Sequence, residues 1–273
     1  MTRARSEKAR PDAERAASAS QELRSRAEVA KLARLLGRDP GELEYLEQVA
    51  PDDLATLREQ TTEMLFAAHD ATFKRLATSS KLLPTGLVSM LAQHAFGPVL
   101  SARIAGLLDP RRAVDIAAKL PVDFLADIAV ELDPRRASDV IAGMPPEHVL
   151  KVTRVLVARG EYVTMGRFVG HLGDGARDAA ITDLDDATLL RTAFVLEDRD
   201  RIDALAELVG EDRIASLAEV AEREQLWPEA LDLLTNLDHK RVADGLGRMD
   251  PEDRELVELR AREQGVELPT VAA

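Results

Sequence analysis

The chain has 273 residues, a formal net charge of −13, 45% hydrophobic residues and only 3% aromatic residues. It contains no cysteine, which excludes disulfides, thiolate nucleophiles and cysteine-ligated metal sites. Its acidity argues against a nucleic-acid partner, because phosphate repulsion would oppose binding. An interior built from Ala, Leu, Val and Ile suits closely packed helix pairs, so the composition favours an all-α protein.

The beginning of the chain is polar and rich in charges of both signs, and we predict a disordered polar arm at residues 1–27. The arm contains no apolar core of a secretory signal. Together with the absence of cysteine, this favours a cytoplasmic location. We divide the rest of the chain into an N-terminal helical region at residues 28–108, a repeat region at residues 109–265 and a tail at residues 266–273.

The segment at residues 71–108 contains no acidic residue, although the chain as a whole is strongly acidic. Its basic residues are Lys74, Arg75, Lys81 and Arg103. Such a segment can lie on an anionic membrane or receive an acidic partner. Its apolar density favours another interpretation, in which it forms the most buried helices of the protein. Proline, glycine and charged residues interrupt the apolar stretch, so we predict no transmembrane span.

Two stretches further along the chain are nearly the same. Residues 108–121 and 132–145 are identical at 9 of 14 aligned positions, and both begin with LDPRRA. In this motif the aspartate can accept a hydrogen bond from the first-turn amides, while proline occupies the first helical position. Asp109-Pro110 and Asp133-Pro134 are therefore predicted to begin helices.

Apolar residues recur in this part of the chain with a step of 12 residues. Within each step they follow the spacing of one helix face, as at Ala113, Ile116, Ala117 and Leu120. Helices of about 9 to 10 residues are too short to be stable alone, so neighbouring helices must hold them. The sequence predicts a superhelical solenoid of short helices in 12-residue half-repeats. The step is marked by Leu108, Leu120, Leu132 and Met144, and again by Leu172, Leu184, Leu196 and Leu208.

Short helices opened by L-D-P-x-x-A and alternating with L-P-x-x resemble the cytoplasmic N-terminal superhelical domain of MgtE-type magnesium transporters. In that family the domain packs against a pair of CBS domains in front of a membrane channel, and its acidic faces bind magnesium. This chain has no CBS-like segment, and Arg112 and Arg136 stand where the family often carries acidic or neutral residues. The resemblance implies an interaction module rather than an enzyme. It is carried by LDPRRA at residues 108–113 and 132–137, LP at residues 120–121, MPPE at residues 144–147 and MDPE at residues 249–252.

Acidic residues are dense at residues 174–223, which hold 14 acidic and 6 basic side chains. An EF-hand fails there, because Thr188 stands where glycine is required and Phe194 where the bidentate glutamate should be. The run EDRD at residues 197–200 alternates in sign and is interpreted as a solvated helix start. Hydrated Mg²⁺ needs only one or two carboxylates, so a weak Mg²⁺ site is the one cofactor hypothesis that we keep. Its candidate ligands are Asp183, Asp185, Asp186, Asp198 and Asp200.

No motif in the sequence points to catalysis. The five histidines lack the paired spacing of a zinc hydrolase, and no glycine-rich stretch matches a phosphate loop. We therefore predict no enzyme and no catalytic residue. The expected function is that of a helical-repeat protein that binds and regulates a protein partner, such as a transporter, in a magnesium-sensitive way. The alternative is a peripheral membrane protein that docks through residues 71–108.

Overall fold

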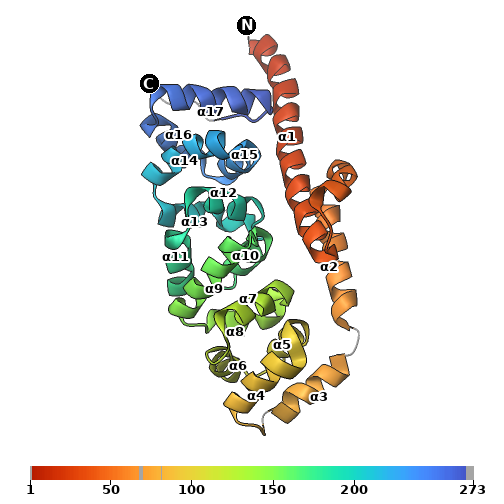
Figure 1. The fold of residues 1–273 in the computed structure, drawn as a ribbon. Coiled ribbons are helices and arrows are strands. Elements are labelled where there is room, and N and C mark those ends of the chain that lie inside the picture. The colour runs from red at the N-terminus through yellow and green to blue at the C-terminus, as the bar shows by residue number, and fades with distance from the viewer. Residues whose placement is uncertain (1, 68–69, 81, 269–273) are drawn as a thin grey trace. The chain divides into compact units, whose positions relative to one another are not determined.

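The computed structural model describes residues 2–67, 70–80 and 82–268. Over these residues the chain is all-helical and contains no strand, as Figure 1 shows. The prediction of an all-α protein is therefore confirmed. None of the helices in the described part of the chain is long and apolar enough to cross a lipid bilayer.

The chain divides into two compact units. The middle unit comprises residues 60–184, and the terminal unit combines residues 1–59 with residues 185–273. This division differs from the predicted regions, which placed a boundary at residue 108. The sequence analysis divided the chain along its length, whereas the terminal unit is built from segments of both chain ends.

The middle unit is a series of short helices in which most helices contact the next but one. Contacts join α3 to α5, α5 to α7, α7 to α9 and α9 to α11, and a second series joins α4, α6 and α8. This alternation means that successive helices belong to different layers of the unit. After the end of α2, the helices are α3 (Asp70–Ser80), α4 (Thr85–Leu91), η2 (Ala92–Phe96), α5 (Gly97–Ala105), α6 (Pro110–Ala117), α7 (Val122–Glu131), η3 (Pro134–Ala137), α8 (Ser138–Ala142), α9 (Pro146–Ala158), α10 (Tyr162–Val169) and α11 (Asp174–Asp183).

The two copies of the LDPRRA motif begin helices as predicted, but they do not form the same helix. In the first copy the Asp109 side chain accepts a hydrogen bond from the Arg112 amide at 3.2 Å, and α6 follows. In the second copy Asp133 accepts from the Arg135 amide at 3.2 Å, and the 3₁₀ turn η3 precedes α8. Asp133 is only 2% exposed and Asp109 is exposed, so the same motif lies in two environments.

Two glycines of the middle unit lie very close to the backbone of a neighbouring segment. A Cβ atom added at Gly106 would lie 2.7 Å from the Arg136 carbonyl oxygen, and one added at Gly173 would lie 2.8 Å from the Ala142 carbonyl oxygen. Both distances are shorter than a methyl group tolerates, so glycine is needed where these helices meet. One apolar cluster beside these contacts consists of Ala102, Ile128, Leu132, Ala137 and Ile141.

The terminal unit packs the N-terminal helix against η1 and against a helix from the C-terminal part of the chain. Helix α1 contacts η1 and α15, α12 contacts α14 and α15, and α14 contacts α16 and α17. The helices are α1 (Thr2–Leu36), η1 (Pro40–Gln48), the first part of α2 (Pro51–Ala67), α12 (Asp186–Phe194), η4 (Arg199–Arg201), α13 (Ile202–Val209), α14 (Glu211–Glu224), α15 (Trp227–Asn236), α16 (His239–Arg248) and α17 (Pro251–Glu263).

Both ends of the described chain contribute buried side chains. The structure places helix α1 where a disordered arm at residues 1–27 was predicted, and Leu23, Ser25 and Ala27 are buried. The polar composition concealed an apolar helix face, because Leu23 and Ala27 lie four residues apart and face the same side. At the other end, Val266 of the predicted tail is 6% exposed and its amide donates to the Ala261 carbonyl at 2.8 Å.

Candidate functional site

The first predicted metal ligand, Asp183, belongs to the middle unit and is already engaged. Arg154 donates to its two carboxylate oxygens at 2.9 and 2.8 Å, in a bidentate ion pair between α9 and α11. These hydrogen bonds hold the pKa of Asp183 below its ordinary value. A carboxylate bound in this way presents little free oxygen to a cation.

Asp185 and Asp186 stand at the beginning of α12 and perform different tasks. Asp185 is the N-cap of the helix, and its carboxylate accepts the Thr188 amide at 2.8 Å and the Thr188 hydroxyl at 3.1 Å. Asp186 accepts from Arg213 of α14 at 2.5 Å. Helix capping and an ion pair between α12 and α14 explain both aspartates without a metal.

Asp198 accepts from Arg201 at 2.6 Å, and both side chains are about half exposed. The side chain of Asp200 lies outside the described residues. Among the residues that the structure describes, no group of three or more His, Asp or Glu side chains could hold a metal ion. The structure therefore does not bring the predicted magnesium ligands together as an open site, because each described carboxylate already has protein donors.

A cluster of buried charges in the terminal unit was not predicted from the sequence. Lys31 of α1 donates to the Glu28 carboxylate at 2.7 Å and approaches the Leu196 carbonyl at 3.4 Å. Arg58 of α2 donates to the same Glu28 at 3.2 Å and to Glu197 at 2.8 Å. The Lys31 side chain is only 1% exposed and that of Arg58 only 9%. These ion pairs join α1, α2 and the segment after α12.

A second ion pair extends this cluster toward α15. Arg199 donates to both oxygens of Asp232 at 2.7 Å and to the Phe194 carbonyl at 3.0 Å. The Asp232 side chain is 1% exposed, and Lys31 interacts electrostatically with both members of the pair. Three acidic and three basic groups thus balance one another. We refer to Glu28, Lys31, Arg58, Glu197, Arg199 and Asp232 as the buried charge cluster.

Burial and mutual attraction set the protonation of this cluster. Burial lowers the pKa of Lys31, and the neighbouring Glu28 opposes that effect. Burial acts to raise the pKa of Glu28, but Lys31 and Arg58 together hold it below the ordinary value. Burial also raises the pKa of Asp232 against the attraction of Arg199. The cluster is therefore a set of charges whose cost of burial is offset only while its members stay together.

The interpretation of residues 197–200 as a solvated, self-neutralising helix start is wrong for two of its members. Glu197 pairs with Arg58 and Arg199 pairs with Asp232, which are distant in sequence. The alternation of sign described local neutrality correctly but gave no information about long-range partners. A lysine at position 31 on an otherwise apolar helix face was the one sequence signal of this cluster.

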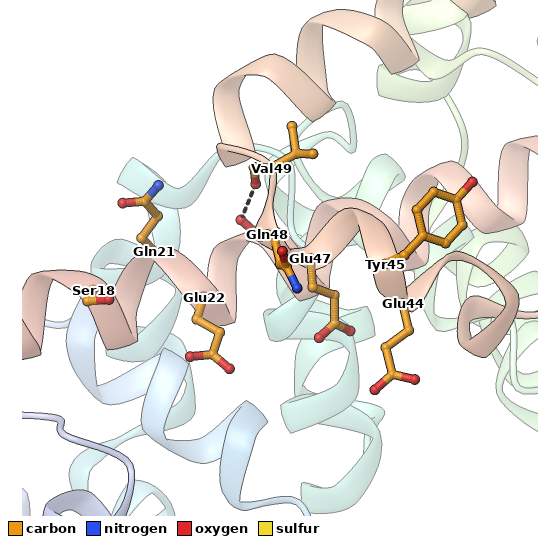
Figure 2. Close-up of a pocket in the computed structure, with 9 residues that line it drawn as sticks. Ser18, Gln21, Glu22, Glu44, Tyr45, Glu47, Gln48 and Val49 are labelled. Atoms are coloured by element: carbon orange, nitrogen blue, oxygen red, sulfur yellow. Dashed lines mark hydrogen bonds between the residues drawn. The ribbon is translucent and has the colours of Figure 1, made fainter.

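A groove of about 670 Å³ lies between α1 and η1 in the terminal unit. Figure 2 shows Glu44 and Glu47 of η1 on the same side as Glu22 of α1, and the Tyr45 ring at the edge of the view. Glu22 and Glu44 have no ion-pair partner among the side chains that the structure describes, and Tyr45 is 69% exposed. The groove is lined by Ser18, Gln21, Glu22, Ser25, Glu44, Tyr45, Glu47, Gln48 and Val49.

The acid-free segment at residues 71–108 is buried on one face only. Val88, Ala92 and Ile104 are buried, as the favoured interpretation required. Leu82, however, is 88% exposed and Met90 is 50% exposed. The prediction that these helices are the most buried of the protein is therefore wrong for their outer face. Lys81 lies outside the described residues.

Comparisons of the chain with protein-family models, with curated proteins and with solved structures find no match. The function therefore has to be inferred from the chain's own geometry.

Proposed function

We propose that this protein is a helical-repeat interaction protein, whose short stacked helices present surfaces to a protein partner. The observation that carries the proposal is the alternation of contacts in the middle unit, where α5, α7, α9 and α11 form one continuous series. Such nearest-neighbour stacking is the physical basis of solenoids, which use their extended surfaces for binding. The resemblance of the LDPRRA repeat to MgtE-type N-terminal domains supports the same class of function.

The repeat also explains why the helices are short. The α-helices of the middle unit from α4 to α11 have 5 to 13 residues, and each would be unstable alone. The 12-residue step lets every helix use the previous pair as its support. In this proposal the chain is a superhelical solenoid over the repeat region, and its role is to hold binding surfaces at fixed spacing. A partner would then recognise several consecutive helices rather than a single pocket.

Magnesium sensitivity is the finer form of this proposal, and the geometry supports it less than the general form. Asp183, Asp186 and Asp198 already pair with arginines, so Mg²⁺ would have to compete with a positive charge at each. Mg²⁺ would act here by opening ion pairs rather than by filling a prepared site. Isothermal titration of the full chain with Mg²⁺ at millimolar concentration tests this form, and the absence of binding heat would contradict it.

Affinity capture tests the general proposal. The tagged full-length chain is used as bait in soluble and membrane extracts, with and without added Mg²⁺, and recovered proteins are identified by mass spectrometry. We expect a protein that also forms a stoichiometric complex with the purified chain in size-exclusion chromatography. If no recovered protein binds the purified chain under either condition, the proposal is wrong.

Bait variants of the α1–η1 groove sharpen this experiment. Glu22→Lys and Glu44→Lys change two exposed glutamates without breaking an ion pair among the described side chains. Glu147→Lys on α9 is the control, because Glu147 is also an exposed glutamate; its carboxylate lies 3.8 Å from His148 Nδ1. Loss of a partner from the groove variants alone would assign that partner to the groove, whereas loss from all variants would indicate a general effect of charge.

A further inference from the structure

The exposed apolar side chains of the middle unit are concentrated near its first helices. Leu82 in the α3–α4 turn is 88% exposed, Met90 is 50% exposed, and Val99 is 53% exposed. Leu87 is 39% exposed and lies three residues before Met90, so these two share one face of α4. We call Leu82, Leu87, Met90 and Val99 the apolar end. Figure 1 shows α4 at the opposite end of the middle unit from α11.

Terminal repeats of a stacked helical protein normally present a polar outer face to water. The apolar end does the opposite at the first helices of the series, since α4 contacts α6 and η2 on its inner side. A side chain as exposed as Leu82 gains nothing for folding. Its apolar surface is therefore available for a contact with something outside the chain.

Positive charge surrounds the α3–α4 turn. Arg112 of α6 donates to the Leu83 carbonyl at 2.5 Å, and Lys119 donates to the Thr85 hydroxyl. Both cations are thereby held at residues that closely follow Leu82 in the chain. The exposed Arg75 of α3 adds a further positive charge.

Negative charge near the turn is sparse. The stretch from residue 71 to residue 108 contributes no carboxylate at all. The acidic side chains on the neighbouring α6 and its cap are Asp109 and Asp115, both exposed. Arg111, Arg112 and Lys119 outnumber them in the same stretch of chain. Positive charges thus outnumber negative charges around the apolar end, although the formal net charge of the chain is −13.

We propose that the apolar end docks on an anionic lipid surface, with Leu82 and Met90 entering the interface and the surrounding arginines and lysines contacting lipid phosphates. A combination of exposed Leu and Met with Lys and Arg is what interfacial attachment requires, because apolar burial and electrostatic attraction add. An anionic lipid surface is negative throughout, and a 38-residue stretch without a single carboxylate has no negative charge that such a surface would repel. The surfaces of protein partners instead carry charges of both signs, and a complementary surface would also carry both signs. A second copy of this chain would bring two positive patches together and is disfavoured for that reason.

This proposal goes beyond the binding of a protein partner, and purified components test it separately from the affinity capture. The full-length chain is mixed with vesicles of phosphatidylglycerol and phosphatidylcholine, or of phosphatidylcholine alone, and flotation is measured at low and at physiological ionic strength. We expect flotation with the anionic vesicles, weakened by salt, and none with phosphatidylcholine alone.

Two sets of variants locate the contact. Leu82→Asp/Met90→Asp is compared with Leu208→Asp/Leu259→Asp, which introduces the same two charges at exposed leucines of the terminal unit. Arg75→Glu/Arg111→Glu is compared with Lys151→Glu/Lys240→Glu. The side chains at all four positions are exposed. Each set keeps the net charge equal between test and control, so any difference reports position rather than total charge.

We expect Arg75→Glu/Arg111→Glu to bind anionic vesicles at least ~30-fold more weakly than wild type, since each basic residue near a lipid surface contributes a factor of about 5. Leu82→Asp/Met90→Asp should also bind more weakly, because it removes apolar contact with the lipid and adds two negative charges. The controls should lose much less. Leu82→Asp alone serves as the second variant where the double substitution disturbs folding, which far-UV circular dichroism would reveal.

Three results would overturn the proposal. The first is a wild-type chain that does not float with anionic vesicles at low ionic strength. The second is equal flotation of the apolar-end variant and its control. The third is a wild-type chain that binds polyglutamate rather than vesicles and loses this binding in Leu82→Asp/Met90→Asp, which would assign the apolar end to an acidic protein partner.

Discussion

The buried charge cluster of the terminal unit and the apolar end of the middle unit depart from the usual distribution of side chains in opposite ways. The cluster places six charges where apolar groups are expected, with Lys31 and Asp232 each 1% exposed. The apolar end places Leu82 and Met90 in water. The first departure serves the fold, because ion pairs hold helices from both chain ends together. The second contributes nothing to the fold, and for that reason points outward to a binding surface.

The largest effect is expected from removing one half of a buried ion pair. Asp232→Ala leaves the Arg199 guanidinium buried without its carboxylate, and we expect a loss of about 3–5 kcal/mol of stability. Urea unfolding followed by the fluorescence of Trp227 measures it, because this single tryptophan is 7% exposed on the same helix. Asp198→Asn is the control, since Asp198 and Arg201 are both half exposed and such pairs contribute about 1 kcal/mol or less. If both variants lost the same stability, the Arg199–Asp232 pair would contribute no more than a half-exposed ion pair, which would contradict this prediction.

The next largest effect carries a pH dependence. Glu28→Gln removes the charge that faces Lys31 and Arg58, and we expect a loss of about 2–3 kcal/mol at neutral pH. The pKa of Glu28 is lower in the folded chain than its ordinary value of 4.5, so its stabilisation is complete above that pH. It disappears as the pH falls through the lowered value, because the unfolded chain then binds the proton first.

Unfolding of wild type and Glu28→Gln over a series of pH values tests this sign. The stability difference between the two chains should stay constant from neutral pH to about pH 5 and shrink at lower pH. A difference that grows as the solution becomes more acidic would contradict the assigned direction.

A smaller effect is expected where the middle unit depends on shape rather than charge. Gly106→Ala would place a Cβ atom 2.7 Å from the Arg136 carbonyl oxygen, and the resulting helix displacement should cost about 1–3 kcal/mol. Gly175→Ala is the matched control, because no atom lies within 4 Å of its added Cβ and alanine favours a helix. Hydrogen exchange of the middle-unit amides, measured by mass spectrometry, compares the two variants, and we expect protection to fall only in Gly106→Ala. Protection that stays as high in Gly106→Ala as in Gly175→Ala would contradict the clash.

The sequence predicts the local structure of this protein better than its long-range contacts. Asp109-Pro110 and Asp133-Pro134 begin helices because capping depends on neighbouring residues alone. The same motif nevertheless gives an α-helix once and a 3₁₀ turn once, and Asp133 is buried whereas Asp109 is exposed. Burial depends on neighbours that are distant in the chain, and no periodicity within the motif contains this information.

The candidate sites show the same limit. Aspartates of residues 174–223 were grouped by their proximity in sequence, but the structure distributes them among separate partners, such as Arg154 for Asp183 and Arg213 for Asp186. The sequence analysis counted the basic residues only toward the net charge of the segment, whereas in the structure individual arginines pair with individual aspartates. The absence of acid from residues 71–108 was visible in the sequence. Which face of that segment is exposed became known only when α4 was placed against α6.

The smallest effect on stability is expected at the apolar end, and it completes the comparison with the buried charge cluster. Leu82→Asp should change the free energy of unfolding by no more than about 0.5 kcal/mol, because an 88% exposed side chain loses almost no packing. Thermal unfolding followed by circular dichroism measures this change. A loss as large as that of Asp232→Ala would mean that Leu82 is buried in solution, so the apolar end would not be a free surface. A stable Leu82→Asp chain that no longer floats with anionic vesicles would separate the two roles, with folding assigned to the cluster and docking to the apolar end.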